Sequence, residues 1–479
     1  MTRAGQWHLN TRQLKRLYVG QRLFAIFLLS EEKPNDLSRS HADEPPRGGA
    51  FHETVITEPL LCVFAGHIQT NCRSLDHKRM FSGILSSQAG HWMKIFVLTK
   101  RQYMGKDLLD DRFGRFRELP LELARLGHDV RGLALGYRRR PEGVFVDGAG
   151  SSGASVTWNS VNFLNGHLPQ LGKYRRHALN LSREFQPDLV WACSDAYHAT
   201  FGRWLAKRIR TRCVIDLYDN FEAFPASRVP AVLPLFRRAV KTADGVTAFS
   251  GRLADYVMQN YGRTEPTTVV ENGIRKDLFQ PRDQKTCRER LGLPKNARII
   301  GTAGALDSSR GIETLFEAFE ILSHDIADLR LALAGPRPRS RQIPAGPRVH
   351  DFKELPHEEV ATFFSALDIA VICYRHSPQG EVSFPQKAYE IIACGVPLIA
   401  AAVGSMNEFL QNYPDCLYEP KNPASLATAI RRQLQLRTPI GYPVPSWPDS
   451  ARKLSDFFQQ VVGQDLTPAA QSTKNHAVR

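Results

Sequence analysis

Hydrophobic and polar residues alternate along much of the chain with the two periods that distinguish strands from helices. A buried-type strand at Lys94–Leu98 is followed by an amphipathic helix at Arg115–Leu126 and by a second strand at Asp129–Leu135. The same alternation predicts strands at 144–146, 155–158, 188–193, 213–217, 245–249 and 267–270, and helices at 174–185, 197–208, 235–242 and 251–261, the last with Ser250 as its N-cap. Such an order favours a mostly parallel sheet with helices on both faces.

A second alternating unit begins after Pro281. Its predicted strands are 297–302, 329–334, 349–352, 369–373 and 398–401, and its helices are 311–321, 358–366, 423–436 and 449–462. The fold class is therefore α/β, with two Rossmann-like, doubly wound domains that face each other across a cleft.

The expected domains are an N-terminal one at 93–277 and a C-terminal one at 278–447, followed by a helix at 448–463 and a disordered tail at 464–479. Residues 1–92 show little periodicity. We expect them to be a poorly ordered extension upstream of a natural start at Met93, with a small accessory domain as the alternative.

Composition narrows the classes of protein that this sequence can encode. The chain has 479 residues and a net charge of +15, with most of the excess between residues 93 and 285. A basic domain attracts phosphates, whether on sugar nucleotides, anionic membranes or nucleic acids, although a solvated basic face is equally consistent with the charge. No aromatic-basic stacking pattern is present, so we expect no nucleic-acid partner.

Apolar runs and cysteines add two further expectations. No apolar run approaches the ~18 residues of a membrane span, so any membrane contact is expected to be peripheral. The eight cysteines include no CxxC pair, which indicates neither a metal site nor a disulfide framework and fits a reducing, cytoplasmic location.

Residues 381–401 carry the most informative motif. Ser383, Lys387 and Glu390 come just before a helix-like run, which a Gly395 turn and a buried strand follow. At the carboxyl end of a parallel sheet, such an acid could hold a sugar hydroxyl. The alternative is a helix with a solvated Lys and Glu.

A glycine-rich loop lies between a strand and a helix at residues 301–312. Gly304 would let the backbone approach an anion, and Arg310 supplies a guanidinium suited to phosphate. The alternative is an ordinary loop in which Ser308 or Ser309 caps the helix. The loop matches neither a dinucleotide fingerprint nor a Walker motif.

Polar residues also follow strands of the first domain. Gly105 and Lys106 lie in the loop after its first strand, and Gly114–Arg115 opens the next helix, so either could accept an anion or simply connect elements. Asp195 follows the strand at 188–193, with His198 expected to be structural, and Asn272 lies at the domain junction.

Three acids, Asp216, Asp219 and Glu222, lie at the carboxyl end of the strand at 213–217, which is unusual for a purely structural loop, although Asp is also a common turn former.

Taken in order, the segments resemble one known family, the retaining GT-B glycosyltransferases of the family-4 type. The segments are MKIFVLTK, LARLGHDV, QPDLVWA, ADGVTAFSGRL, VVENGIRKDLFQP, GTAGALDSSRGIETLFEAF, LALAG, LDIAVICY and FPQKAYEIIACGVPLIAA, and they extend from about Met93 to Val462. The resemblance implies a nucleotide-sugar donor held mainly by the second domain, no bound metal or cofactor, and an acceptor deprotonated with help from the leaving diphosphate.

The resemblance also implies roles for individual residues. Glu390 would bind the ribose hydroxyls and Arg310 the diphosphate, with the Gly304 backbone beside it. Ser383 and Lys387 belong to a PxKxxE variant of the donor loop.

Three positions depart from the family pattern. The acid expected eight residues before Glu390 is Val382, with Glu381 one residue upstream as its substitute. A basic residue expected before Arg310 is Ala305. The histidine expected in the first domain is Tyr218, which leaves Asp219 as the nearest polar group.

The sequence thus predicts a cytoplasmic sugar transferase, with peripheral contact with the inner face of the membrane as an option. A UDP- or GDP-linked sugar would be its donor and a glycan or lipid-linked intermediate of surface polysaccharide assembly its acceptor, with Asp219, Glu381 and Lys387 as catalytic candidates. The alternatives are a nucleotide-sugar epimerase on the same fold and a non-catalytic nucleotide-sugar-binding protein.

Overall fold

The computed structural model describes residues 92–463 except 104, 149–152, 167, 225–226, 228, 339–341 and 379. These residues belong to one compact unit. The extension predicted at residues 1–92 lies outside the described residues except for Trp92. The tail predicted at 464–479 lies outside them entirely.

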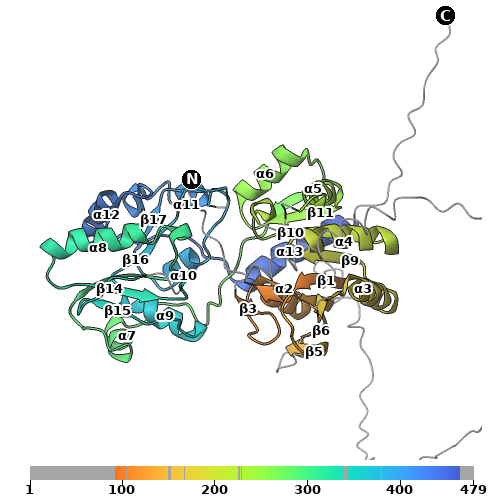
Figure 1. Cartoon of the computed structure of the whole chain (residues 1–479), viewed down its shortest axis with the longest axis horizontal. Helices are drawn as coiled ribbons and strands as arrows, with labels where there is room; N and C mark the ends of the chain where they lie inside the picture. The colour runs from red at the N-terminus through yellow and green to blue at the C-terminus, as the bar shows by residue number, and fades with distance from the viewer. Residues whose placement is uncertain are drawn as a thin grey trace, which may run out of the picture. The chain divides into compact units, whose positions relative to one another are not determined.

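An eight-stranded sheet organises the first half of the described chain, which we call the first lobe (Figure 1). Its strand order is β12-β11-β10-β9-β1-β4-β6-β5, and every pairing is parallel except that of β5 with β6. The strands are β1 (Lys94–Lys100), β4 (Asp129–Gly136), β5 (Gly143–Gly148), β6 (Ser155–Asn162), β9 (Leu189–Cys193), β10 (Arg212–Leu217), β11 (Gly245–Ala248) and β12 (Thr267–Val269). The helices between them are α2 (Arg115–Arg125), α3 (Leu171–Phe185), α4 (Ala196–Ile209), α5 (Val232–Thr242) and α6 (Gly251–Tyr261).

A six-stranded, wholly parallel sheet organises the second lobe, with the order β15-β14-β13-β16-β17-β18. Its strands are β13 (Arg298–Ala303), β14 (Leu329–Ala334), β15 (Val349–Asp351), β16 (Ile369–Ile372), β17 (Leu398–Ala401) and β18 (Leu417–Tyr418). Its helices are α7 (Gln284–Arg290), α8 (Glu313–Asp325), α9 (His357–Ala366), α10 (Lys387–Ala393), α11 (Gly404–Phe409) and α12 (Pro423–Leu436).

Burial explains why the central strands read as continuous apolar runs. All residues of β9, β11, β16 and β17 are buried, as expected for parallel strands covered by helices on both faces. Polar residues mark the helix starts: Asp195 caps α4, Ser250 caps α6 as predicted, and Asn422 caps α12. The α/β fold class expected from the sequence is confirmed.

Helix α13 (Trp447–Gly463) follows the second lobe in sequence but packs against the first lobe. Leu454 and Phe458 join the core that contains Ile95 and Leu119, and the Phe458 ring lies 5.6 Å from that of Trp191. Figure 1 shows α13 beside α2. The first lobe therefore needs residues from both ends of the described chain.

The structure corrects two details of the predicted elements. Helix α10 begins at Lys387, so Lys387 and Glu390 lie in its first turn rather than before it. The N-cap of α8 is Ile312, which has no side-chain hydrogen bond, so neither Ser308 nor Ser309 caps that helix. Both serines lie in a short 3-10 helix, Ser308–Arg310, whose cap Asp307 accepts a hydrogen bond from the Ser309 backbone.

Candidate functional site

Lys387 brings the glycine-rich loop and helix α10 together at the carboxyl end of the second sheet. Its Nζ donates a hydrogen bond of 2.7 Å to the carbonyl oxygen of Ala303, the last residue of β13. Gly304 follows with φ +114°, and a Cβ there would lie 2.9 Å from Lys387 Nζ. Glycine at 304 is therefore needed both for the backbone conformation and for the ammonium group beside it.

Arg310 lies in the same cluster. Its guanidinium donates a hydrogen bond to the Tyr374 hydroxyl and lies 5.0 Å from the centre of that ring. Burial, followed by the charge of Arg310, lowers the pKa of Lys387 to about 8. Two cations thus lie close enough to repel each other, which is the arrangement expected where a polyanion binds.

Glu390 is the acid of this cluster, one helical turn after Lys387. Burial raises its pKa to about 7, although the charge of Lys387 opposes the shift. Its carboxylate forms no hydrogen bond or ion pair with any residue that the structure describes. It is therefore available to accept hydrogen bonds from hydroxyl groups of a ligand.

Ser383 connects this cluster with the first lobe. Its hydroxyl donates to the Asp219 carboxylate over 3.3 Å, and Ser250 of the first lobe donates to the Val382 carbonyl over 2.9 Å. Asp219 follows β10, so the structure brings this predicted residue to the donor loop.

Glu381 lies elsewhere. Its carboxylate is 2.6 Å from Nδ1 of His376 and 3.5 Å from the guanidinium of Arg252, and 40% of its side chain is exposed. The structure therefore pairs Glu381 with His376 and Arg252 rather than with Lys387 or Glu390.

The candidates for the acceptor side have different partners in the structure. Lys106 pairs with Glu354 over 3.0 Å at an exposed position, and Gly105 before it has φ +83°. Asn272 accepts a hydrogen bond of 3.0 Å from Arg115.

Asp195 has a structural role as the N-cap residue of α4. It accepts hydrogen bonds from the backbone and from Nδ1 of His198, at 2.9 and 2.7 Å, and from the Tyr137 hydroxyl at 2.8 Å. Burial alone would raise the pKa of Asp195, but His198 and Lys100 bring it well below its ordinary range.

Two of the three acids at the carboxyl end of β10 have structural partners. Asp216 binds Arg115 through two hydrogen bonds, of 2.9 and 2.7 Å, and both side chains are fully buried. Glu222 accepts two hydrogen bonds from Arg237 and one each from Tyr256 and Tyr261. Of the two alternatives for Gly114–Arg115, the structure favours a simple connection, because Arg115 is enclosed and already paired.

Lys100 is a site residue that the sequence analysis missed. It is the last residue of the central strand β1, and its Nζ donates a hydrogen bond of 2.8 Å to the Tyr218 hydroxyl. Burial lowers the pKa of Lys100, although Asp195 and Asp219 oppose the shift. A polar residue at the carboxyl end of the first predicted strand was the available signal.

Neither a metal site nor a membrane-spanning element is found in the described part of the chain. Its His, Cys, Asp and Glu side chains form no group of three suited to a metal ion. Among residues 92–463, with the gaps given above, no helix has the length and apolar character needed to traverse a bilayer.

Two family models match the chain, one on each lobe. Residues 115–278 match "Glycosyltransferase Family 4" and residues 297–435 match "Glycosyl transferases group 1". The chain is 30% identical over 223 residues to D-inositol 3-phosphate glycosyltransferase 1 of Catenulispora acidiphila, covering 43% of this chain and 52% of that protein. It is 28% identical over 252 residues to the putative teichuronic acid biosynthesis glycosyltransferase TuaC of Bacillus subtilis, covering 52% of this chain and 62% of that protein.

The chain thus spans about half the length of the curated relatives that it matches first. Among solved structures, Anabaena HepE in complex with UDP-glucose aligns with a TM-score of 0.53 at 18% identity, covering 78% of this chain and 98% of that one. At this identity the likeness concerns the fold alone, and it agrees with the two-lobed architecture expected from the sequence.

Proposed function

Since this chain belongs to the family-4 glycosyltransferases, we propose that it transfers a sugar from a nucleotide-sugar donor to a glycan or lipid-linked acceptor with retention of anomeric configuration. The donor is UDP- or GDP-linked, and the reaction uses no resident metal or cofactor. Surface polysaccharide or glycoconjugate assembly is the process in which such an acceptor would be consumed.

The observation that carries this proposal is the cluster of Arg310, Lys387 and Glu390. None of the three forms an ion pair with a described residue of opposite charge. Two cations beside a glycine backbone suit a diphosphate, and a carboxylate with free acceptor positions suits the two hydroxyls of a ribose. A nucleotide sugar presents both groups on one molecule.

In the proposed reaction, Arg310 and Lys387 hold the diphosphate and stabilise the charge that builds on it as the glycosidic bond breaks. The acceptor hydroxyl attacks the anomeric carbon, and its proton goes to the departing diphosphate. Asp219 lies at the first-lobe side of this point, where its carboxylate can orient the acceptor hydroxyl through a hydrogen bond. Water is excluded by ligand and protein together, which strengthens each of these interactions.

The acceptor class follows from charge. The excess of basic residues lies in the part of the chain that includes the first lobe. The relatives' names mention an inositol phosphate and teichuronic acid, both of which are anionic. We propose an acceptor that carries a phosphate or a carboxylate.

A thermal-shift screen against UDP- and GDP-sugars tests the donor assignment, because a ligand that binds the folded state raises its melting temperature. Glu390→Ala should abolish the shift that the best donor gives to wild type. Glu320→Ala, an exposed acid on α8, is the matched control and should retain it. Equal shifts in both variants would refute the role of Glu390.

Incubation of the best donor with and without acceptor then separates the possible chemistries. Transfer to an acceptor supports the proposal. An epimerised donor formed without acceptor, or binding without turnover across a broad acceptor panel, would contradict it in favour of one of the two alternatives.

A further inference from the structure

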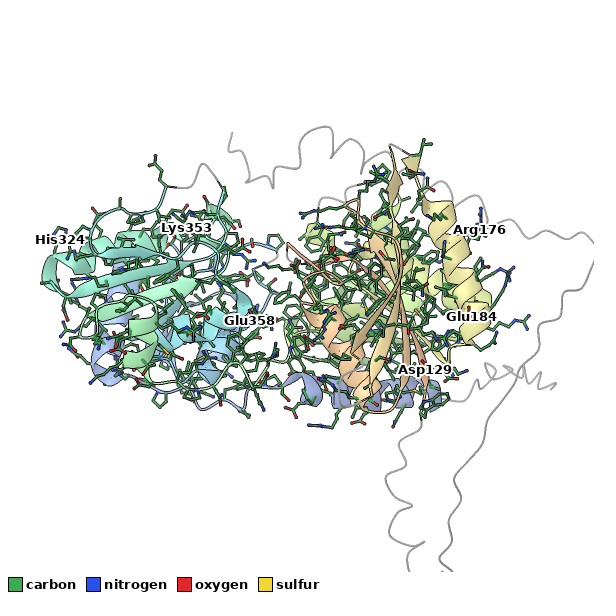
Figure 2. All side chains as sticks on the ribbon, turned by 90° about the horizontal axis from the view of Figure 1, so that it is seen from below. Asp129, Arg176, Glu184, His324, Lys353 and Glu358 are labelled. Atoms are coloured by element: carbon green, nitrogen blue, oxygen red, sulfur yellow. The ribbon has the colours of Figure 1, made fainter. Side chains whose placement is uncertain are left out.

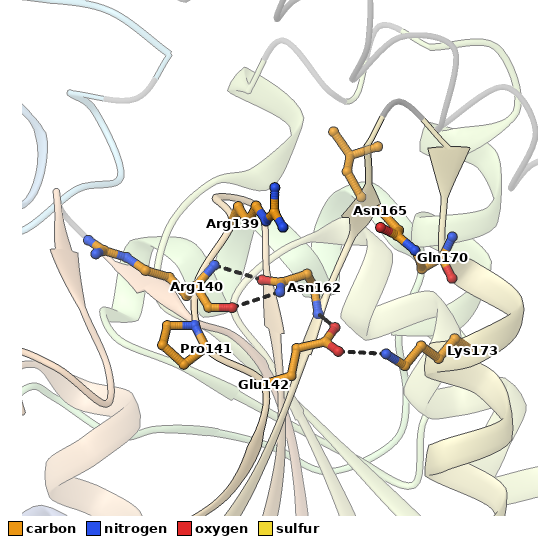
Figure 3. Close-up of a pocket in the computed structure, with 9 residues that line it drawn as sticks. Arg139, Arg140, Pro141, Glu142, Asn162, Asn165, Gln170 and Lys173 are labelled. Carbon is orange, nitrogen blue, oxygen red and sulfur yellow. Dashed lines mark hydrogen bonds and ion pairs between the residues drawn. The ribbon is translucent and has the colours of Figure 1, made fainter.

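A cavity lies on the first lobe (Figure 3). Its volume is about 530 Å³, which is in the range that holds a small ligand. Most of its lining residues are polar, among them Arg139, Glu142, Asn162, Asn165, Gln170 and Lys173. Strands β4 and β6 end at Gly136 and Asn162, so the cavity is at the carboxyl edge of the first sheet.

One wall of the cavity is the loop that follows β4, and hydrogen bonds hold it in place. Asn162 accepts from the backbone N–H of Arg140 at 3.1 Å and donates to its carbonyl at 2.7 Å. The fully buried Arg101 donates to the Pro141 carbonyl at 2.8 Å. Because this wall is formed before any ligand arrives, binding requires little loss of loop entropy.

The opposite wall is the start of helix α3. Lys173 in its first turn pairs with Glu142 over 2.6 Å, which joins the two walls (Figure 3). Gln170 occupies the N-cap position without a side-chain cap, and the first turn contains no acid. Figure 2 shows Arg176 on α3 at the end away from Asp129, where β4 begins, so the start of α3 lies at the edge where the strands end.

The balance of charges in the cavity favours an anion. Its single carboxylate, on Glu142, is already occupied by Lys173 and by the backbone N–H of Asn162 at 2.7 Å. Arg139 is exposed and forms no ion pair or hydrogen bond with a residue for which a position is described. Its guanidinium can bind a phosphate or carboxylate through two parallel hydrogen bonds.

The amides of Asn165 and Gln170 add donors and acceptors of the kind that bind sugar hydroxyls. The loop after β4 also links the cavity to residues near the proposed site. Tyr137 opens that loop, and its hydroxyl binds Asp195, the acid that lies near Lys100. A ligand in the cavity would therefore lie at the same end of the first sheet as Lys100, where β1, β4 and β6 all end.

We propose that this cavity binds an anionic sugar unit of the acceptor, with Arg139 on the phosphate or carboxylate and with Asn165 and Gln170 on ring hydroxyls. The assignment to the acceptor rests on the proposed transferase function. The binding of an anionic sugar does not, and it can be measured in the absence of any donor.

Isothermal titration of the full chain with glucose 6-phosphate, glucuronate and glucose tests the site. The wild type should bind at least one of the two charged sugars about tenfold more tightly than glucose, which corresponds to roughly one well-placed charged contact. Arg139→Gln should remove this preference and leave the weak binding of glucose unchanged. Arg208→Gln removes a similar exposed charge at the far end of α4 and should behave as wild type.

Two outcomes would overturn the proposal. One is a preference for the charged sugars that persists in Arg139→Gln. The other is that no soluble sugar binds while the protein sediments with anionic-lipid vesicles in an Arg139-dependent manner, which would make this surface a contact for lipid headgroups. A failure of the proposed transferase function would look different. The wild type would then still prefer the charged sugars but would bind no nucleotide sugar.

Discussion

Two groups of charged residues at opposite ends of the second sheet differ in how they are paired. At the amino ends, Arg288 pairs with Asp368 over 2.7 Å, and Arg288 also donates to three backbone carbonyls. Asp368 in turn accepts from the backbone of Ile299. At the carboxyl ends, Arg310 and Lys387 have only a phenol and a carbonyl as partners, and Glu390 has no hydrogen-bonding partner in the part of the chain that the structure describes.

Both ends belong to the same strands and share one core, so differences in packing do not explain the contrast. A half-buried charge without a partner lowers the stability of the folded protein. Other charges at the carboxyl end are paired, such as Arg375 with Glu313 over 3.0 Å. The cluster that lacks counter-ions there therefore indicates where a ligand completes the structure.

Substitution at the amino end should give the largest loss of stability. Asp368→Ala leaves the nearly buried Arg288 without its counter-ion and the Ile299 N–H without its acceptor, so we expect the free energy of unfolding to fall by about 3 kcal/mol. Urea denaturation measures this loss. Donor binding by the folded variant should be unchanged, and a loss of binding as large as that in Glu390→Ala would show that the two ends are not independent.

Donor affinity should depend on pH in a narrow window. The Glu390 carboxylate forms as pH rises through about 7, and Lys387 loses its proton above about 8. Because both ionised forms are needed, affinity should be greatest between these values and fall by about tenfold for each pH unit beyond either limit. Calorimetric titration of a donor from pH 5.5 to 9.5 measures the profile.

A matched variant distinguishes the two limbs of that profile. In Lys387→Arg the cation stays charged at all these pH values, so the decline on the alkaline side should disappear while the acidic side remains. A decline that persists in this variant would assign it to another group.

The smallest expected effect is a gain in stability at the carboxyl end. The folded-state pKa of Glu390 is raised, so the folded protein binds a proton more tightly than the unfolded chain. The stability that the protonated Glu390 side chain contributes is therefore fully present below about pH 4.5 and is lost as pH rises through about 7. Glu390→Gln should raise the melting temperature by a few degrees at pH 8 and by little at pH 4.5.

That gain is the converse of the loss expected for Asp368→Ala. Thermal unfolding at the two pH values measures it. A melting temperature lower than that of wild type at pH 8 would mean that Glu390 has a stabilising partner, and the contrast between the two ends would then no longer hold.

The strands and helices could be predicted because their hydrophobic periods are local. Burial could be predicted directly from the apolar runs of β1 and β9 and from the spacing of the leucines in α2. Helix α7 was missed because its seven residues, QKTCRER, are mostly polar and show no apolar face. Its stability comes from Arg288, which contacts residues up to 80 positions away.

The site was predictable to a smaller extent. Gly304, Arg310, Lys387 and Glu390 belong to recognisable motifs, and the structure brings them together. Which partners an acid has depends on tertiary contacts, however. Asp216 and Asp219 are three residues apart in one motif, yet the first is paired with Arg115, 101 positions away, and the second meets the donor loop.

Helix α13 sets the order in which the protein can be completed during translation. The first lobe is synthesised early, but the ribosome must add roughly 180 residues after β12 before Trp447 and the rest of α13 emerge, which takes about 10–40 s at ordinary elongation rates. Until then an apolar surface that includes Ile95 and Trp191 remains uncovered. The lobe that is made first is therefore completed only after the second lobe has been synthesised, and the nascent chain is vulnerable to aggregation or to chaperone capture until α13 has emerged.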